Sequence, residues 1–480
     1  MTTKYPGMKS ISQQLILLTT LILISITTQA QVLINEFSAA NFSQFTDNFG
    51  EYEDWIELYN AGNNTVDISG YFLSDRGDNP YKYEIPAGVS IQANDHLRIW
   101  ASGNDVYSGG SIHTNFKITQ TRISEMLILS NNVGMPIDSH HIEVPNQMHH
   151  SWGRTSDGAA TWGVLTSPTP NGPNTNVDLP YATRPELLPE AGFYTGSVSI
   201  TITSPDTGVD VYYTTDGTTP DGGSNLYSGA FNLFETTVVK AIAISDNSNI
   251  PDSHVDVHTY FVDDNHTVPV VSISGDNLST LLNGSAGIEP HGYFEFFTAE
   301  GERKSDSSGE FNKHGNDSWA YPQRGIDYIA RDQFGDDFAI KHKVFPDKTR
   351  NTFQRVILKA AANDNYPFGN GAHIRDAYIS QLSHNANMEL DERTNEPCIL
   401  YLNGEYWGVY EIREKVDDPD FTKYYYDQGR QWIDYLKTWG TTWAEYGSGN
   451  DWFDLRDFIV NNDMSDLANY AFVESEMELL

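Results

Sequence analysis

The chain has 480 residues, which is too long for one ordinary hydrophobic core and predicts about three domains. Aspartate and glutamate outnumber lysine and arginine by 65 to 29, which gives a formal net charge of −36. The electrostatic field of so negative a protein repels phosphate backbones and anionic lipid headgroups, so nucleic acid is not an expected partner. Aromatic residues make up 12% and charged residues 20% of the chain, a balance typical of β-rich modules rather than of disordered acidic tails.

The first thirty residues have the pattern of a secretory signal peptide. Lys4 and Lys9 precede the apolar run LILLTTLILISITT, which is too short to span a bilayer, and small or polar residues precede Gln31. We therefore expect cleavage after Ala30 and a secreted or cell-surface protein with no later transmembrane span; an uncleaved N-terminal anchor is the alternative. Cys398 is the only cysteine, which excludes an intrachain disulfide and predicts a buried strand position.

Residues 31–175 consist of short apolar stretches separated by polar turns, which predicts a β-sandwich. The stretches are VLINEFSA, DWIELYNAG, VDISGYFLSD, HLRIWASG, MLILSN and TWGVL. The Asn-Glu, Asp-Trp-Ile-Glu-Leu-Tyr-Asn and Leu-Ser-Asp motifs and the closing SWGRTSDGAATWGVLTSPTPNGPN resemble the lamin tail domain family. That resemblance implies a binding or scaffold module rather than a catalyst.

Two histidine pairs lie in the last third of this first module: His140 with His141, and His149 with His150. Imidazoles suit zinc or copper, so a metal site has to be considered. Adjacent residues of a strand point to opposite faces, however, and the pairs are therefore expected not to hold a metal.

A linker rich in Pro, Asn and Thr, placed at 176–190, leads into a second β module over 191–263, where VSITITS and VDVYYTTDG alternate apolar and polar residues. The Tyr-Tyr-Thr-x-Asp-Gly-Thr-x-Pro motif followed by Val-Lys-Ala-Ile-Ala resembles the chitobiase C-terminal, or fibronectin-associated, module of secreted bacterial proteins. A passive spacer is the preferred interpretation. Carbohydrate contact through Tyr212 or Tyr227 is the alternative.

From residue 264 the pattern changes to strands that alternate with helices, so residues 264–480 are predicted to be an α+β domain. A helix is expected in GAHIRDAYISQLSHNANM, and the glycines before it could hold a phosphate at its N-terminus. Lys359 and Arg375 would assist, oriented by Asp364 and Asp376. The plainer alternative is an ordinary helix start beside a structural ion-pair cluster.

The ordered succession EFFTAEGERK, SGEFNKHGNDSWAYPQRGIDYIARDQFG, FQRVILKAAANDNY, AHIRDAYISQL and CILYLNGEYWGVYEIREKVDD resembles the CotH protein kinase family of spore-coat proteins. The resemblance implies an atypical protein-kinase-like fold that transfers the γ-phosphoryl group of ATP, with Mg or Mn, to protein side chains. It places Arg324 where the family commonly has a phosphate-contacting lysine and makes Lys359 and Arg375 further candidates. Arginine lacks the compact geometry of lysine, which weakens the Arg324 assignment.

The segment LNGEYWGVYEIREK is predicted to be a β-hairpin with a two-residue type I′ turn at Asn403-Gly404. Alternation places Tyr406, Tyr410 and Ile412 on one face and Trp407, Val409, Glu411 and Arg413 on the other. If the kinase-like fold holds, Glu411, Glu414 and Lys415 are candidate residues of a nucleotide cleft. An ion-paired sheet edge is the alternative.

The resemblance implies that the catalytic and metal-binding aspartates follow the hairpin, and they are expected beyond Leu480, so that no metal ligand is expected within the 480 residues. The apolar pattern of Leu467, Tyr470, Val473 and Leu480 predicts a helix without a terminating Gly, Asn or Pro, which favours a fragment of a longer chain with negligible phosphotransfer. One alternative function is a non-catalytic surface adhesin or scaffold with a pseudokinase-like domain. Another is a carbohydrate-active enzyme, which the chitobiase-like module and the many carboxylates suggest.

Overall fold

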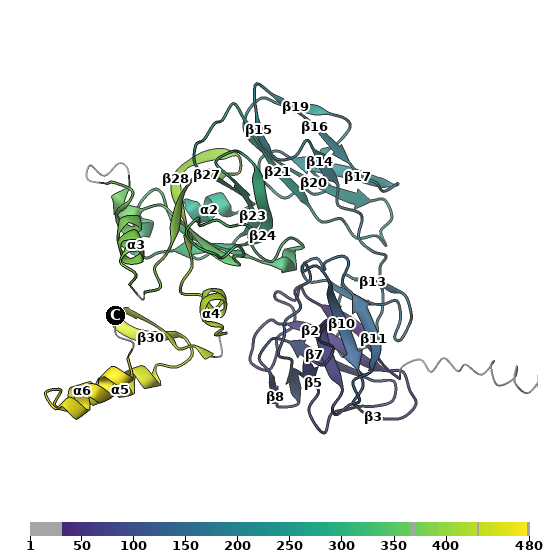
Figure 1. Cartoon of the computed structure of the whole chain (residues 1–480). Helices are drawn as coiled ribbons and strands as arrows, with labels where there is room; N and C mark the ends of the chain where they lie inside the picture. The colour runs from purple at the N-terminus through teal and green to yellow at the C-terminus, as the bar shows by residue number, and fades with distance from the viewer. Residues whose placement is uncertain (1–30, 366–370, 389, 430–431, 478–480) are drawn as a thin grey trace, which may run out of the picture.

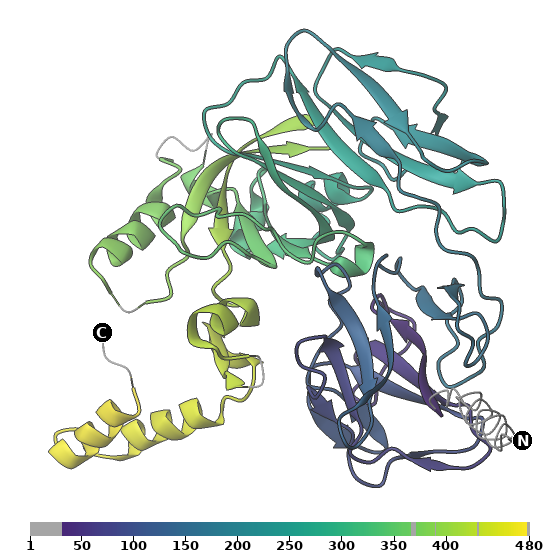
Figure 2. The same cartoon turned by 45° about the vertical axis from the view of Figure 1, so that its right-hand side comes forward.

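The structure is a computed structural model that describes residues 31–365, 371–388, 390–429 and 432–477. The predicted signal peptide lies outside the described residues. Three β-rich units follow one another along the chain, and a mixed segment of helices and a hairpin comes last (Figure 1). The second unit lies against one side of the third, while the C-terminal segment extends from the opposite side (Figures 1 and 2).

The first unit is a sandwich of two sheets, with strand orders β13-β12-β1-β2-β7-β9-β8 and β11-β10-β4-β5. One apolar cluster that includes Phe37, Ile56, Leu73 and Leu127 lies between them, which confirms the predicted sandwich. The strands are β1 (Val32–Ser38), β2 (Asp54–Asn60), β3 (Val66–Asp67), β4 (Phe72–Arg76), β5 (Tyr83–Glu84), β6 (Ser90–Ile91), β7 (His96–Ala101), β8 (Val106–Ser108), β9 (Ser111–His113), β10 (Glu125–Ser130), β11 (Pro136–His141), β12 (Ser151–Arg154) and β13 (Trp162–Leu165).

The second unit is a smaller sandwich of the sheets β14-β16-β19 and β15-β21-β20-β17-β18. Its core contains Ile200, Val239, Ala241 and Tyr260. The strands are β14 (Glu186–Leu188), β15 (Gly192–Tyr194), β16 (Val198–Thr203), β17 (Val209–Thr214), β18 (Asn225–Leu226), β19 (Phe231–Leu233), β20 (Thr237–Ser245) and β21 (Asp256–Val262). β14 lies inside the segment predicted as linker and pairs with β16.

The third unit is a closed barrel with the strand order β22-β23-β24-β25-β26-β28-β27. Strands β22 and β27 pair in parallel, and the other neighbours are antiparallel. The elements are β22 (Val270–Ser274), α2 (Leu278–Leu282), β23 (His291–Phe297), β24 (Arg303–His314), η1 (Asp317–Ala320), β25 (Gly325–Ala330), η2 (Asp332–Phe334), β26 (Arg355–Lys359), η3 (Ala362–Asp364), β27 (Asn395–Leu402) and β28 (Glu405–Glu414).

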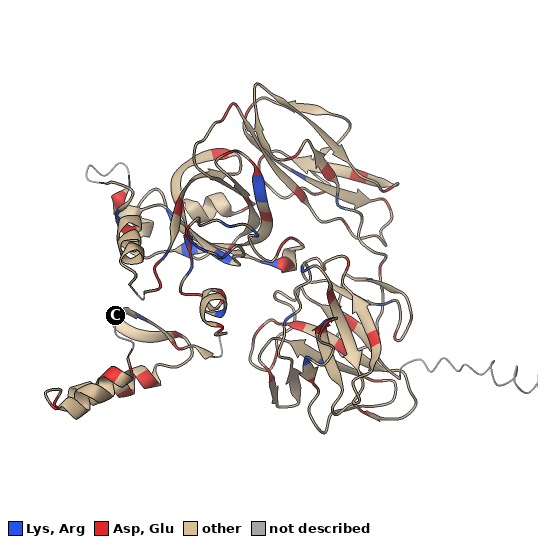
Figure 3. Cartoon of the chain, in the orientation of Figure 1, with Lys and Arg blue, Asp and Glu red and all other residues tan. Residues whose placement is uncertain are grey.

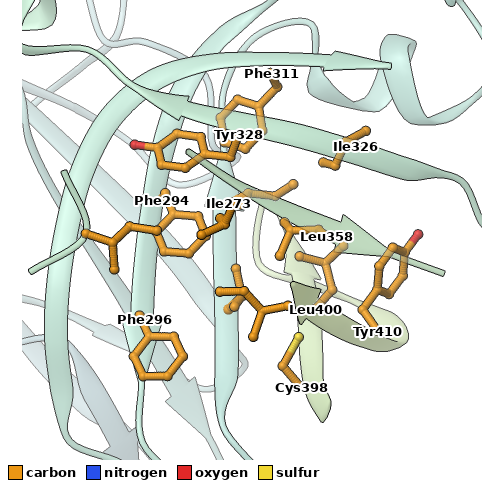
Figure 4. Packing of buried hydrophobic residues seen from close by; sticks show 14 of the residues in the cluster. Ile273, Phe294, Phe296, Phe311, Ile326, Tyr328, Leu358, Cys398, Leu400 and Tyr410 are labelled. Atoms are coloured by element: carbon orange, nitrogen blue, oxygen red, sulfur yellow. The ribbon is translucent and has the colours of Figure 1, made fainter. Parts of the chain in front are cut away.

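Alternating side chains of the barrel strands fill its interior, because successive residues of a strand point to opposite faces. Phe294 stacks on Tyr328 with ring centroids 4.7 Å apart, and Leu400 and Tyr410 lie across from them (Figure 4). Leucines of α2 join the same cluster. Cys398 is fully buried among these residues, as predicted, and burial raises the pKa of its thiol.

The β27–β28 hairpin confirms the predicted turn, since Asn403 and Gly404 have φ angles of 52° and 85°. The predicted facing of Tyr406 and Trp407 is wrong. The register shifts between Leu400 and Tyr401, so that one extra residue is accommodated on β28. This bulge turns Trp407 toward the barrel core and leaves Tyr406 57% exposed.

Helix α3 (Arg375–Asn385) lies in the chain between β26 and β27. The segment that follows the barrel contains α4 (Pro419–Tyr426), β29 (Tyr435–Trp439), β30 (Thr441–Tyr446), α5 (Asn450–Asn461) and α6 (Leu467–Ser475). The helices predicted around α3 and α6 are both present. Neither α5 nor α6 buries a residue. In the described part of the chain, no helix combines the length and apolarity that a bilayer crossing requires.

The units contact one another through both apolar and polar side chains. Phe193 and Phe261 of the second sandwich pack with Phe297 and Tyr401 of the barrel. Between the first sandwich and the barrel, the backbone N–H of Gln120 donates to Asp332 Oδ2 at 2.8 Å. The barrel therefore contacts both sandwiches.

Candidate functional site

The outer surface of β25, β26 and β28 carries charge where the inner surface is apolar. We call the side chains of Asp327, Lys359, Glu411, Arg413 and Lys415 the charged face. Asp327, Lys359, Glu411 and Arg413 alternate along their strands with core residues such as Tyr328, Leu358 and Ile412, and Lys415 follows the end of β28. Glu411, Arg413 and Lys415 are nevertheless buried, because helix α3 and the chain around β29 cover this surface. Both blue and red segments occur on the ribbon of the barrel (Figure 3).

Lys415 is held by two carboxylates. Its Nζ lies 2.9 Å from Asp327 Oδ2 and 3.4 Å from Asp417 Oδ1. The Nδ1 atom of His314 lies 2.9 Å from the other oxygen of Asp327. Burial opposes ionisation of Asp327, but the hydrogen bond with His314 and the nearby Lys415 ammonium together lower the pKa of that carboxyl. Asp327 therefore stays ionised and fixes the position of Lys415.

Asp417 forms ion pairs with three basic side chains, one that follows the barrel strand β28 and two from other segments that come after α3 in the chain. Besides Lys415, Lys437 Nζ lies 3.1 Å from Oδ2 and Arg393 Nη2 lies 3.5 Å from Oδ1. Burial by itself would raise the pKa of Asp417, but Lys415, Arg393 and Lys437 lower it to about 2. This carboxylate links β28 to β29.

A second group joins the charged face to the first turn of α3. Asp376 Oδ2 lies 3.0 Å from Lys359 Nζ and 3.3 Å from Arg413 Nη1. Arg413 also donates to Glu411, with its Nε 2.8 Å from Oε2. Lys359 and Glu411 are cross-strand partners of β26 and β28. The predicted orienting role of Asp376 therefore applies to Lys359.

The start of α3 is arranged differently from a phosphate site. Asp364 accepts hydrogen bonds from the backbone N–H groups of Ala372, Ile374 and Arg375 at 2.7, 2.8 and 2.9 Å. The guanidinium of Arg375 pairs with the same carboxylate, with Nε 2.9 Å from Oδ1. A carboxylate thus occupies the donors that a phosphate would need, and this geometry matches the plainer alternative. Gly369 lies outside the described residues.

Glu414 does not lie on the charged face. It points into one end of the barrel, fully buried, where Arg350 Nη1 lies 3.1 Å from Oε1 and the hydroxyl of Tyr425 donates to the same oxygen at 3.1 Å. Arg350 also pairs with Asp420 of α4. Burial raises the pKa of Glu414 against the effect of Arg350. This pair fixes α4 to the barrel.

Arg324 is separate from both groups. Its guanidinium donates to the carbonyl oxygens of Leu282 at 2.9 Å and Trp319 at 3.1 Å. It therefore binds backbone carbonyls in the last turns of α2 and η1 rather than the charged face. Of the six predicted cofactor-binding residues, the structure brings Lys359, Glu411 and Lys415 to one surface and places Arg324, Arg375 and Glu414 elsewhere.

Further residues complete these groups and were not singled out as candidate site residues from the sequence: His314, Asp327, Arg350, Arg393, Arg413, Asp417, Asp420, Tyr425 and Lys437. The local sequence could have indicated Asp327, since it is the one charged residue within the strand GIDYIA. Lys437 likewise interrupts YLKTW. The partners of these residues are distant in sequence, and pairing such as that of Asp327 with Lys415 follows only from the barrel.

The other predicted contacts lie outside this region. His140 stacks on Trp162 with centroids 3.9 Å apart, and burial lowers its pKa to about 4. Tyr227 packs against the core of its own sandwich. Among the residues that the structure describes, no three His, Cys, Asp or Glu side chains form a group that could hold a metal ion.

Three family models match consecutive parts of the chain. The lamin tail domain matches residues 25–143, the chitobiase/β-hexosaminidase C-terminal domain 189–255, and the CotH kinase protein model 331–470. No curated protein matches the chain. A solved structure of Clostridium thermocellum CbhA fibronectin(III)-like modules is similar at 12% identity, covering 43% of this chain and 85% of that one, and the TM-score of 0.13 is too low to indicate a shared fold. The chain therefore has the domain architecture that its motifs predicted, in which segments similar to a lamin tail domain and a chitobiase C-terminal domain precede a CotH kinase family domain.

Proposed function

We propose that the chain is part of a secreted or cell-surface protein that transfers the γ-phosphoryl group of ATP to protein side chains. The observation that carries the proposal is the match to the CotH kinase model over 331–470, which includes β26, β28 and α3. These elements supply Lys359, Arg413 and Lys415 to one surface. An atypical kinase-like fold for residues 264–480 is part of the same proposal.

The charged face fits the phosphate part of ATP. Phosphoryl transfer depends on cations that position the phosphates and offset the charge that develops on them. Lys359 and Lys415 each hold a carboxylate, with Nζ 3.0 Å from Asp376 and 2.9 Å from Asp327. Phosphate oxygens would compete with these carboxylates for the same ammonium groups.

The fit to a divalent metal is poorer. Mg²⁺ or Mn²⁺ would bridge and neutralise phosphate oxygens when bound. The described residues hold no group of His, Cys, Asp or Glu suited to such an ion. The cations of the charged face would bind and orient the phosphates.

The proposal is tested by nucleotide-dependent stabilisation of the whole chain. ATP with Mg²⁺ should raise the melting temperature, because a ligand of the native state stabilises it. Lys415→Met should abolish the shift, whereas Lys423→Met should leave it intact, since Lys423 pairs with Asp427 on the exposed side of α4. A protein that ATP does not stabilise, or a shift that survives Lys415→Met, would contradict the phosphate assignment.

A second candidate function is a surface scaffold with a pseudokinase-like domain. It is favoured by the complete internal pairing of Lys359, Arg413 and Lys415, which serves stability without a ligand. Incubation of the protein with radiolabelled ATP and candidate acceptor proteins separates the two. Label on an acceptor that depends on Lys415 supports the kinase, and ATP binding without transfer supports the scaffold.

Export is proposed from the signal-peptide pattern of residues 1–30. Expression with the intact N-terminus should release a protein that begins at Gln31, which mass spectrometry of the exported material would detect. Retention of the first thirty residues would support the anchor instead.

A further inference from the structure

A cavity of about 300 Å³ lies where the three β-rich units meet. We call it the junction cavity. Met148 comes from the first sandwich, Ile242 from the second and Tyr293 from the barrel. Small-molecule sites occupy about 300–1,000 Å³, so this volume suits one small ring rather than a nucleotide.

Two buried polar atoms, one in the cavity lining and one beside a ring that lines it, have no hydrogen-bond partner among the described residues. Ser308 lines the cavity and is 3% exposed, and its Oγ is unpartnered. Lys240 is fully buried, with its Nζ unpartnered and 4.7 Å from the centre of the Tyr293 ring that lines the cavity. Leaving such groups unpaired costs about 1–3 kcal/mol each, so a hydroxylated ligand or water would be stabilised there.

The access side of the cavity is polar. Thr219 and Asp276 are both exposed at its edge, and Asp276 accepts hydrogen bonds from the backbone N–H and the hydroxyl of Thr219, both at 2.9 Å. Ser308 and Ile242, which also line the cavity, are buried. The lining therefore combines an exposed carboxylate with a buried hydroxyl.

The charges around the cavity favour a neutral ligand. The carboxylates of Asp276, Glu295 and Asp216 act on the Lys240 ammonium, so its charge is already offset. Burial lowers the pKa of Lys240 to about 7. An anion would be attracted by the Lys240 ammonium but repelled by the Asp276 carboxylate at the edge of the cavity.

We propose that the junction cavity binds a neutral sugar of monosaccharide size. Each sugar hydroxyl both donates and accepts, which matches the Ser308 hydroxyl in the lining, the Lys240 amine beside the Tyr293 ring and the Asp276 carboxylate at the edge. The rings of Tyr293 and Phe334 supply flat apolar surface for the sugar ring. This site differs from the sandwich surface around Tyr212 and does not depend on the kinase proposal.

The test is saturation-transfer NMR and calorimetric titration of the whole chain with glucose and with N-acetylglucosamine, each at millimolar concentration. One of them should bind saturably, and Ser308→Ala should weaken it by about threefold to tenfold, the loss of one hydrogen bond. Lys240→Met should weaken it further. Ser199→Ala, an exposed hydroxyl on the opposite sheet of the second sandwich, and Lys304→Met, exposed on β24, are the matched controls.

Two results would overturn the site. One is the absence of saturable binding of both sugars. The other is binding that Ser308→Ala and Lys240→Met leave unchanged but Tyr212→Ala removes, which would place the sugar on the sandwich surface. Circular dichroism of each variant separates loss of binding from loss of fold, and Lys240→Met keeps an unbranched side chain of similar length in the same buried position.

Discussion

The barrel buries its aromatic side chains, whereas the C-terminal segment β29–α6 exposes several of its own. In the barrel, Phe294 and Phe311 are fully buried, and the charges lie on the other side of the same strands. In the C-terminal segment, Trp439 is 70% exposed and α5 and α6 bury nothing. Burial of apolar surface is the main source of stability, so the barrel is the rigid support for the charged face.

The largest difference in stability between the two regions is expected when an aromatic ring is removed from each. Phe294→Ala deletes a side chain that stacks on Tyr328 and should lower the free energy of unfolding by about 3–5 kcal/mol. Phe472→Ala removes a ring of α6 that contacts Phe458 and is 44% exposed, and should cost about 1 kcal/mol or less. Urea denaturation measures both. Equal costs would mean that the C-terminal segment is packed as firmly as the barrel.

Breaking a buried ion pair should have the next largest effect. Arg350→Met leaves Glu414 buried without its cation and should destabilise the protein by about 3 kcal/mol. Arg456→Met removes an exposed pair with Asp457 in α5 and should cause no measurable change.

The double variant Arg350→Met, Glu414→Gln supplies the control, because it removes both charges and should recover part of the loss. Chemical denaturation of the three variants is the measurement. A cost of Arg350→Met no larger than that of Arg456→Met would show that α4 is not held to the barrel by this pair.

The contact between the first sandwich and the barrel should depend on pH. Burial raises the pKa of Asp332 to about 7, with the Gln120 N–H acting in the opposite direction. Because the folded state binds this proton more tightly than the unfolded chain, Asp332 makes the protein less stable as the pH rises from about 4 to about 7. Asp332→Asn should remove this pH-dependent loss of stability. Relative to the unsubstituted protein, its free energy of unfolding should gain on the order of 2 kcal/mol near pH 7.

Thermal or urea unfolding of both proteins across that pH range provides the measurement. The buried His140 and His258, whose pKa burial lowers to about 4, contribute in the opposite direction in both proteins, so only the difference between the two curves is diagnostic. A difference that does not grow with pH would contradict the burial of a titrating carboxyl at this contact.

The smallest effect is expected at two hairpin glycines with left-handed backbone. Gly404 in the barrel hairpin has φ of +85°, and Gly440 in the β29–β30 hairpin has φ of +77°. Alanine at either position should cost about 1 kcal/mol from backbone strain alone. Gly404→Ala should cost more, because its Cβ would lie 3.3 Å from the carbonyl oxygen of Thr236 in the second sandwich. Equal losses in denaturation would show that the two units separate freely at this point.

Local patterns predicted the strands well, because period-two alternation and turn residues act over a few positions. The stretches DWIELYN and RVILK became β2 and β26, and Asn403-Gly404 formed the expected turn. Alternation failed at Trp407, where a bulge shifted the register. A bulge depends on the partner strand, and the sequence of one strand does not specify it.

The candidate site was predicted only in part. Lys359, Glu411 and Lys415 share one surface, but Arg324 binds backbone carbonyls near α2 and Glu414 faces inward with Arg350. The charge of each residue was evident, whereas its partner lies tens of residues away in the chain. Asp327 and Lys415, which are 88 positions apart, illustrate why the ion pairs could not be read from local spacing.

By itself, the sequence determined the order of the β-rich units, the positions of most strands and the family resemblance of each segment, because these depend on short-range patterns of hydrophobicity and turn residues. The tertiary structure decided that the third unit closes into a barrel, that its outer strands bring Lys359, Arg413 and Lys415 together, and that three units enclose the junction cavity. Those features arise from strand closure and from contacts between residues distant in the chain, which are fixed by burial of the whole core rather than by any local segment.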